Sequence, residues 1–294
     1  MLNPNSFIKV TVTTLATCML MACGGSSGSG GSNGNDTSGD TKYVLSLNSA
    51  ESANTGVVGK TVYSINVKDN DGIAVYGETP TLKPMMAMNA GHHHSSPHTG
   101  CTETNSLGNS DCTVYFIMAS AMNGNAMGTW TVDIELEDAE TLSFNPNVTM
   151  PMDETVRVNL KGVDDKIGVT PRTYNIFNNS AASNAEGERS IELFISSKET
   201  MMSFPALATN TTLSEGTADE LSVNSIEVLV STDKDAVTWT TATTNGDGVW
   251  TAEVENYTDT FYVKLSVNSE TKMNGEFDYA TFEKTSSMMN MAAQ

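Results

Sequence analysis

The feature that most constrains the fold is a repeated alternation of apolar and polar residues. Six segments show this period of two: 43–47, 61–67, 128–136, 155–160, 190–195 and 261–267. Successive side chains of a strand point to opposite faces, so the pattern predicts strands with one buried face. Turn-forming pairs such as Asn123-Gly124 separate the segments. Many short strands without a period of 3.6 predict an all-β fold of immunoglobulin-like antiparallel sandwiches.

A weak internal repeat predicts two such sandwich domains. Each half has an Asn-Gly turn before a Trp-bearing strand, around Trp130 and Trp250, and a methionine pair upstream, Met85-Met86 and Met201-Met202. Similar offsets are what a duplicated domain gives. The predicted segments are a signal peptide (1–22), a lipidated cysteine with a linker (23–42), a first sandwich (43–145), a second sandwich (150–272) and a Met-rich C-terminal tail (273–294).

The first 22 residues have the form of an export signal. The apolar stretch Val10–Ala22 is too short to span a bilayer of about 30 Å, but it suits a signal-peptide core. It ends in Leu20-Met21-Ala22-Cys23, which resembles the lipobox of bacterial lipoproteins. The resemblance implies cleavage before Cys23 and a lipid anchor on its sulfur. The alternative is an ordinary secretory signal, which leaves Cys23 as a free thiol.

The segment after Cys23 favours the lipoprotein interpretation. Gly24–Thr41 contains no apolar residue, so it is predicted to be a flexible tether with a root-mean-square reach of about 23 Å. A lipid anchor followed by a tether predicts a protein of the cell envelope, on the periplasmic face of the outer membrane or on the cell surface. Its expected partners are the membrane, through the lipid, and another envelope protein.

Charge and motif content argue against two classes of function. Acidic residues outnumber basic ones 35 to 15, and no basic patch is present, so nucleic acid is not an expected partner. All four histidines lie in one segment, and the sequence has neither a Gly-x-Ser-x-Gly motif nor a phosphate-binding glycine loop. We therefore expect a protein that is not an enzyme.

Cys101 and Cys112 are the two cysteines outside the signal and the anchor. An even pair in an exported protein predicts a disulfide. It would close a short polar loop and stabilise the fold by about 3 kcal/mol. A pair of thiolate metal ligands is the alternative.

The candidate metal site is the segment around the histidines. His92, His93, His94 and His98 follow three methionines, Met85, Met86 and Met88. Imidazole suits copper, zinc and nickel, and thioether sulfur selects Cu(I). Copper is therefore the expected metal, ahead of zinc and nickel. Neighbouring strand residues face opposite ways, so joint use of these histidines requires a loop. The alternative is an exposed polar loop that binds metal only incidentally.

The same region carries a family resemblance. The run Lys83–His92, then Tyr115–Met118 and Met127–Val132, resembles the Met/His and Gly-Trp signature of YtkA-like and FixH-like domains. The resemblance implies an immunoglobulin-like sandwich that handles copper, with Met85, Met86, Met88 and His92 as ligands and Trp130 in the core. His93, His94 and His98 depend on residue chemistry alone.

These observations predict a membrane-anchored lipoprotein that binds a transition metal for storage, delivery or sensing. The alternative is a non-metal structural or interaction lipoprotein of the envelope.

Overall fold

The computed structural model describes residues 41–179, 188–255 and 259–284. These residues form β-strands and one short 3₁₀ helix, Ala50–Asn54, and contain no α-helix. Accordingly, this part of the chain has no helix that could span a bilayer. The predicted all-β fold is confirmed. The predicted signal peptide, Cys23 and most of the linker lie outside the described residues.

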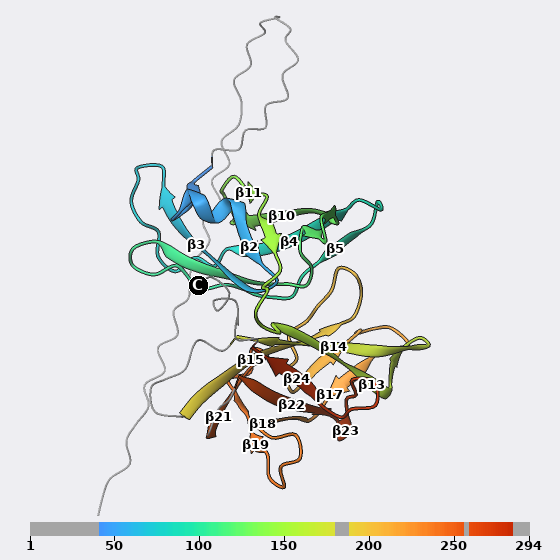
Figure 1. Ribbon diagram of the computed structural model, residues 1–294. Coiled ribbons are helices and arrows are strands. Elements are labelled where there is room, and N and C mark those ends of the chain that lie inside the picture. The colour runs from blue at the N-terminus through green and yellow to red at the C-terminus, as the bar shows by residue number, and fades with distance from the viewer. Residues whose placement is uncertain (1–40, 180–187, 256–258, 285–294) are drawn as a thin grey trace, which may run out of the picture. The chain divides into compact units, whose positions relative to one another are not determined.

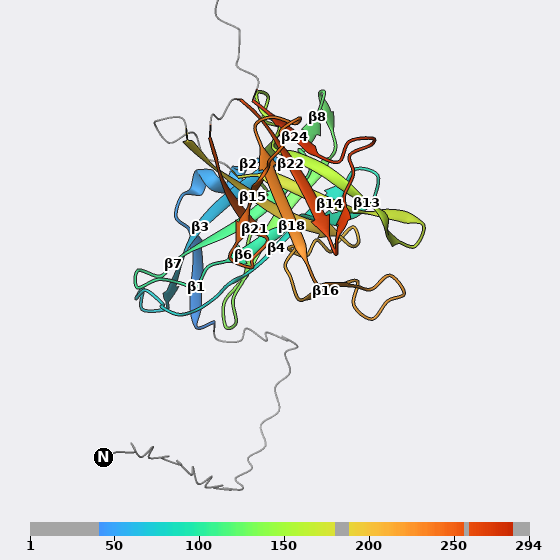
Figure 2. The same ribbon diagram turned by 90° about the horizontal axis from the view of Figure 1, so that it is seen from below.

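Two antiparallel sheets form the first sandwich (Figure 1). One has the strand order β1 (Tyr43–Leu47), β3 (Gly59–Asp69), β7 (Asn109–Phe116), β6 (His98–Cys101). The other has the order β11 (Leu142–Phe144), β10 (Gly128–Glu135), β4 (Thr81–Met88), β5 (His93–Ser95). Figure 2 shows β1, β3 and β7 side by side. Two minor pairs complete it: β2 (Thr55–Val57) with β12 (Asn147–Thr149), and β8 (Ala121–Met122) with β9 (Asn125–Ala126).

The alternation read from the sequence builds the core of this sandwich. On β3 the alternate residues Tyr63, Ile65 and Val67 are buried, as are Trp130, Val132 and Ile134 on β10. The two inner faces thus meet in one apolar cluster. Trp130 is fully buried, as expected, and its indole nitrogen donates to the carbonyl of Met118 at 3.0 Å.

Two larger antiparallel sheets form the second sandwich. One has the order β13 (Arg157–Ile167), β14 (Thr170–Asn178), β15 (Glu188–Lys198), β21 (Val249–Glu255), β20 (Thr243–Thr244). The other has the order β19 (Thr240–Thr241), β18 (Ile226–Ser231), β22 (Thr260–Val267), β23 (Glu270–Thr271). A further pair is β16 (Thr211–Leu213) with β17 (Leu221–Val223). A second apolar cluster lies between the sheets and includes Trp250. Two antiparallel sandwiches are therefore present, as predicted.

Both sandwiches extend beyond their predicted ends. The first includes β12, whose Val148 is buried in its core, so it continues past residue 145. The second includes β24 (Ala280–Glu283), which pairs with β22 and buries Phe282, so part of the segment predicted as a tail from residue 273 is a core strand (Figure 1).

The methionine pairs do not occupy equivalent positions in the two sandwiches. Met86 is fully buried on β4, opposite Trp130 on β10. Met201 and Met202 follow β15 in a connecting segment and are about half exposed, at 45% and 48%. Trp250 instead lies opposite Leu193 of β15. The repeat thus holds for the tryptophan strands and not for the methionines.

An aromatic cluster joins the sandwiches, which belong to one compact unit. Tyr115 from β7 packs against Phe177 of β14 and Phe194 of β15, and all three are buried. The Tyr115 hydroxyl accepts a hydrogen bond from the Asn179 side chain at 3.1 Å. Nearby, the backbone N–H of Ser95 donates to the carbonyl of Met201 at 2.9 Å. Residues on the outer face of one sheet are therefore buried by the neighbouring sandwich.

Candidate functional site

The predicted His/Met site is distributed over two strands rather than one loop. β4 and β5 are antiparallel neighbours, with Met86 opposite His94 and Met85 opposite Ser95. Alternation turns Met86 and His94 into the core, while Met85 is 41% exposed on the other face. The expectation of an open loop over 92–98 is wrong, because His93–Ser95 adds an edge strand to the sheet.

His94 is a core residue. It is 1% exposed and meets Trp130 edge to face, with ring centroids 5.1 Å apart. Its Nδ1 lies 3.0 Å from the Ser95 carbonyl, and a carbonyl only accepts, so Nδ1 carries the proton. Burial lowers the pKa of His94; the Ser95 hydrogen bond opposes this shift, and the charges of Lys198 and Arg157 add to it. The imidazole is therefore neutral at physiological pH.

The remaining candidate ligands are dispersed. His92 and His93 are exposed at the turn into β5, Met88 is half-buried at the end of β4, and His98 begins β6 in the opposite sheet. Within residues 41–179, 188–255 and 259–284, no group of three or more His, Cys, Asp or Glu side chains could hold a metal. Metal binding by the full set of seven residues stays a prediction from the sequence.

The predicted disulfide is present. Cys101 of β6 and Cys112 of β7 are directly opposite in the sheet and are bonded to each other. The bridge closes the segment that contains Thr104 and Leu107. It therefore fixes both ends of a loop at one tip of the first sandwich.

A feature that the sequence analysis missed is an apolar group at that tip. Ile73, Tyr76 and Leu107 are 64%, 71% and 68% exposed. They belong to two loops, 70–78 and 104–108, which we call the tip loops. Large apolar side chains that gather on a surface mark contact sites for partners more often than lone ones do.

Backbone hydrogen bonds hold the tip loops together. The Val67 N–H donates to the Gly108 carbonyl, and the Val67 carbonyl accepts from Val75. Farther along, Gly77 N–H donates to the Thr104 carbonyl at 3.1 Å, and Thr104 N–H donates to the Glu78 carbonyl at 2.8 Å. Gly108 has a φ of +75°, and a Cβ there would lie 2.4 Å from the Val67 carbonyl oxygen. This close approach requires glycine.

Four acidic residues lie in or beside the tip loops, together with exposed Lys68, which forms a bridge with Ala74. Asp71 and Glu103 are exposed, and Asp69 and Glu78 are partly so. Asp69 accepts hydrogen bonds from the backbone N–H groups of Asp71 and Ile73 at 3.0 and 2.8 Å, which fixes the turn that presents Ile73. The tip loops therefore carry exposed apolar side chains together with mostly acidic neighbours, a combination that suits a protein contact site.

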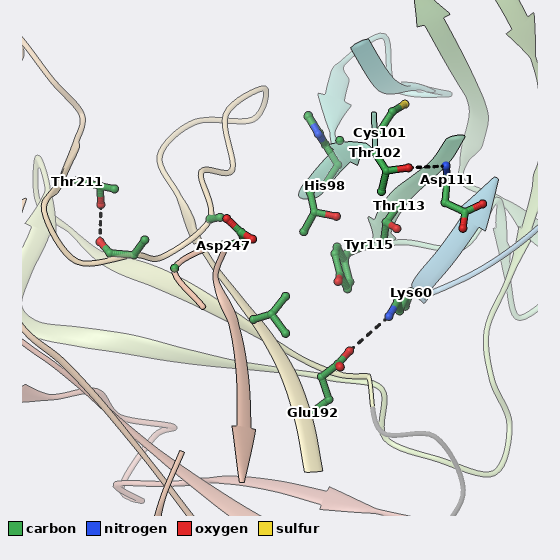
Figure 3. Close-up of a pocket in the computed structure, with 16 residues that line it drawn as sticks. Lys60, His98, Cys101, Thr102, Asp111, Thr113, Tyr115, Glu192, Thr211 and Asp247 are labelled. Atoms are coloured by element: carbon green, nitrogen blue, oxygen red, sulfur yellow. Dashed lines mark hydrogen bonds and ion pairs between the residues drawn. The ribbon is translucent and has the colours of Figure 1, made fainter. Parts of the chain in front are cut away.

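A polar pocket of about 580 Å³ borders the aromatic cluster (Figure 3). Lys60 and Glu192 point toward each other across it and form an ion pair at 3.3 Å. His98, Asp111 and Asp247 also line it. His98 thus lines a pocket that none of the other three histidines lines.

Comparison with known proteins gives only distant likenesses. No known family matches the chain, and neither does any curated protein. Among solved structures, the S-layer protein SbsC (domains 4–9) aligns over 82% of this chain with 11% identity and a TM-score of 0.25. The Yersinia pseudotuberculosis adhesin InvE aligns over 81% with 13% identity and a TM-score of 0.25. The Escherichia coli adhesin FdeC aligns over 84% with 13% identity and a TM-score of 0.26, covering 98% of that structure. The chain spans 31% of the SbsC structure and 57% of InvE.

Proposed function

We propose that this protein is a lipid-anchored, non-catalytic interaction protein of the cell envelope, which binds a partner protein through the tip loops. The observation that carries the proposal is the exposure of Ile73, Tyr76 and Leu107 together on hydrogen-bonded loops. Burying such side chains against a partner is favourable by about 25 cal/mol per Å² of apolar surface. Tyrosine is also among the residues that contribute most to contact energies.

The chemistry of the tip loops specifies the partner. The acidic side chains in and beside them, in a chain with a net charge of −20, repel anionic surfaces. We therefore propose a partner that presents an apolar patch flanked by Lys or Arg. An anionic lipid surface does not fit these acidic side chains. The predicted tether after Cys23 would keep the body within a few tens of ångströms of the membrane, where an envelope partner is available.

The tip is tested with the variant Ile73→Ser/Tyr76→Ser/Leu107→Ser. Binding of the labelled protein to envelope fractions of its own host is measured as a saturation curve, in the Cys23→Ser background that removes the anchor. We expect at least a tenfold weaker Kd for the tip variant, and weaker wild-type binding as salt is raised.

The matched control replaces three exposed apolar residues of the second sandwich: Val163→Ser/Val169→Ser/Val237→Ser. These side chains are 52%, 95% and 101% exposed. The control is expected to bind as the wild type does. Equal saturation curves for the tip variant and the control would refute the proposed tip function.

The anchor has its own test. Replacing Cys23 by Ser is expected to move the full chain from the membrane fraction to the soluble fraction, with the fold unchanged. Continued membrane association of Cys23→Ser would argue against lipidation and would leave the tip proposal intact.

A further inference from the structure

A second pocket at the junction of the sandwiches has a charge opposite to that of the protein as a whole. It has a volume of about 380 Å³ and lies between β5 of the first sandwich and the outer face of β13, β14 and β15. Arg157, Lys161 and Lys198 all line it. Among the described residues around it there is no Asp or Glu, although acidic residues outnumber basic ones 35 to 15 in the chain.

Alternation along the strands explains why the three cations meet. Arg157 and Lys161 are four residues apart on β13, so they share a face. Asn159 lies between them on that face and is opposite Asn175 of β14. Lys198 ends β15 on the same side of the sheet as Phe194 and Ser196. The three cationic side chains thus lie on the outer face of this sheet, beyond the part that the aromatic cluster occupies.

These cations lack side-chain partners among the residues that the structure describes. None of Arg157, Lys161 and Lys198 forms an ion pair or side-chain hydrogen bond with another described residue. Arg157 is half-buried, and burial lowers the pKa of its guanidinium. A buried guanidinium without a counter-ion is costly, so a carboxylate would be expected beside it in an acidic protein. The absence of one leaves room for an anion from outside.

Three buried polar atoms in the pocket lining also lack partners among the described residues. The side-chain N–H₂ group of Asn175, a residue 2% exposed, is a donor without an acceptor, whereas His94 Nε2 and Asn159 Oδ1 are acceptors without a donor. Buried amide donors are normally satisfied, so the Asn175 group indicates a missing acceptor. Asn175 lies on β14, which pairs with β13, the strand that carries Arg157. A carboxylate or sulfonate oxygen would supply that acceptor.

Apart from Thr173, the rest of the lining is apolar. Met88, Ile117 and Met118 come from the first sandwich, and Met201 and Phe204 from the second. Methionine side chains adapt to ligands of irregular shape. A pocket of several hundred Å³ with an apolar wall and a few polar groups suits a small organic molecule.

We propose that this pocket binds a small organic anion that has a carboxylate or sulfonate head and an apolar body. The head lies against Arg157, Lys198 and the Asn175 amide, and the body lies against the methionines and Phe204. Because residues of both sandwiches line the site, the ligand also strengthens their junction. This inference is independent of the proposed tip function.

The experiment uses 8-anilinonaphthalene-1-sulfonate as the probe and N-phenyl-1-naphthylamine as its uncharged counterpart. The full-length protein carries Cys23→Ser, so that it is not lipidated. Fluorescence titration of this folded protein is expected to show one saturable sulfonate site. The uncharged amine is expected to bind at least tenfold more weakly. Arg157→Gln/Lys198→Gln should weaken sulfonate binding at least tenfold and leave amine binding unchanged. The matched control is Lys234→Gln, a lysine in an exposed pair with Asp235, and it should bind as the wild type does.

Equal affinity for the sulfonate and the amine, or wild-type affinity in the double variant, would overturn the proposal. A competition on the unmodified pocket gives an answer even if the double variant does not fold. Decanoate is expected to displace the bound sulfonate, and decanol at the same concentration is not. Displacement by both to the same extent would show an apolar cavity without anion selectivity.

Discussion

Tyr115 of the first sandwich stacks on Phe194 of the second, with ring centroids 3.9 Å apart and an angle of 10° between the planes. Phe177 packs against Tyr115 from the same sheet as Phe194, at a centroid distance of 5.3 Å. Burial raises the pKa of Tyr115 to about 12, the Asn179 hydrogen bond partly offsetting it. The neutral phenol thus contributes an apolar face to the junction. Each sandwich buries an aromatic residue only because the other is present.

Removal of one ring is therefore expected to weaken the junction. Phe194→Ala deletes a fully buried ring, and such changes cost about 3–5 kcal/mol. We expect the calorimetric transition of the variant to split into two, because the sandwiches lose their coupling. The control is Phe277→Ala in the same sandwich, where the ring is 57% exposed and the expected cost is below about 1 kcal/mol. A single transition at the wild-type temperature in Phe194→Ala would contradict the coupling.

A buried ionic cluster stabilises the second sandwich. Asp165 accepts from Arg172 Nε at 2.8 Å and from Lys272 Nζ at 3.1 Å, and both cations are 1% exposed. Asp165→Asn leaves these charges undercompensated, which is expected to cost about 3–5 kcal/mol in urea denaturation. The control is Asp235→Asn, which removes an exposed pair with Lys234 and should leave the urea midpoint almost unchanged. Equal urea midpoints for both variants would refute a stabilising role.

The pKa of Asp165 leads to a prediction about how stability depends on pH. Burial raises the pKa of Asp165, but hydrogen bonds from Tyr174 and Arg172 and the charge of Lys272 outweigh burial, so the pKa lies below 3.8. The folded state thus binds the proton less readily than the unfolded state. The stabilisation is complete above about pH 4 and is lost as pH falls through the lower folded value. The difference in the free energy of unfolding between wild type and Asp165→Asn should therefore become smaller below pH 4. A constant gap between pH 5 and 2.5 would contradict this.

Local alternation predicted β1, β3, β10, β13, β15 and β22, because each buries one face of a two-layer sandwich. The six predicted segments did not include β4, β7, β14 and β18, and the pattern failed for β5 and β24. The β5 residues His93, His94 and Ser95 carry no apolar pattern, and His94 is buried by Trp130 and by the neighbouring sandwich. The β24 strand has only four residues, and its core position follows from pairing with distant β22. Contacts with residues distant in the sequence therefore determine that β5 and β24 form strands.

The candidate sites depend even more on distant contacts. The disulfide was predictable, because two cysteines in a chain with a predicted export signal have few other roles. The apolar tip was not: Ile73 and Leu107 are far apart in sequence, and hydrogen bonds through Val67 bring their loops together. The histidine run was visible as a cluster, but strand alternation and a change of sheet separate its members. Sequence proximity therefore did not reveal how the candidate metal ligands are separated in the fold, and it concealed the tip.

Copper binding by the histidines stays a prediction that titration can decide. His92 and His93 are the exposed neighbours, and two imidazoles on one turn are an incomplete ligand set. We expect Cu(II) and Zn(II) to bind more weakly than micromolar to protein purified without a tag, and His92→Gln/His93→Gln to reduce that binding further. Sub-micromolar binding that is lost in the variant of all four histidines would instead support the metal function.

His94 predicts a second pH effect, in the neutral range. Its pKa is lowered by burial from 6.5, so the unfolded state takes up a proton that the folded state does not. The stability of the protein should therefore fall as pH drops from 7 through 6.5, by at most about 1.4 kcal/mol per pH unit from this group. His94→Gln removes the effect, whereas His93→Gln, on the same strand but exposed, should keep it. Urea denaturation at pH 7.5, 6.5 and 5.5 measures all three proteins. Parallel pH profiles for wild type and His94→Gln would mean that the buried imidazole accepts a proton as readily as in the unfolded chain, which its packing against Trp130 argues against.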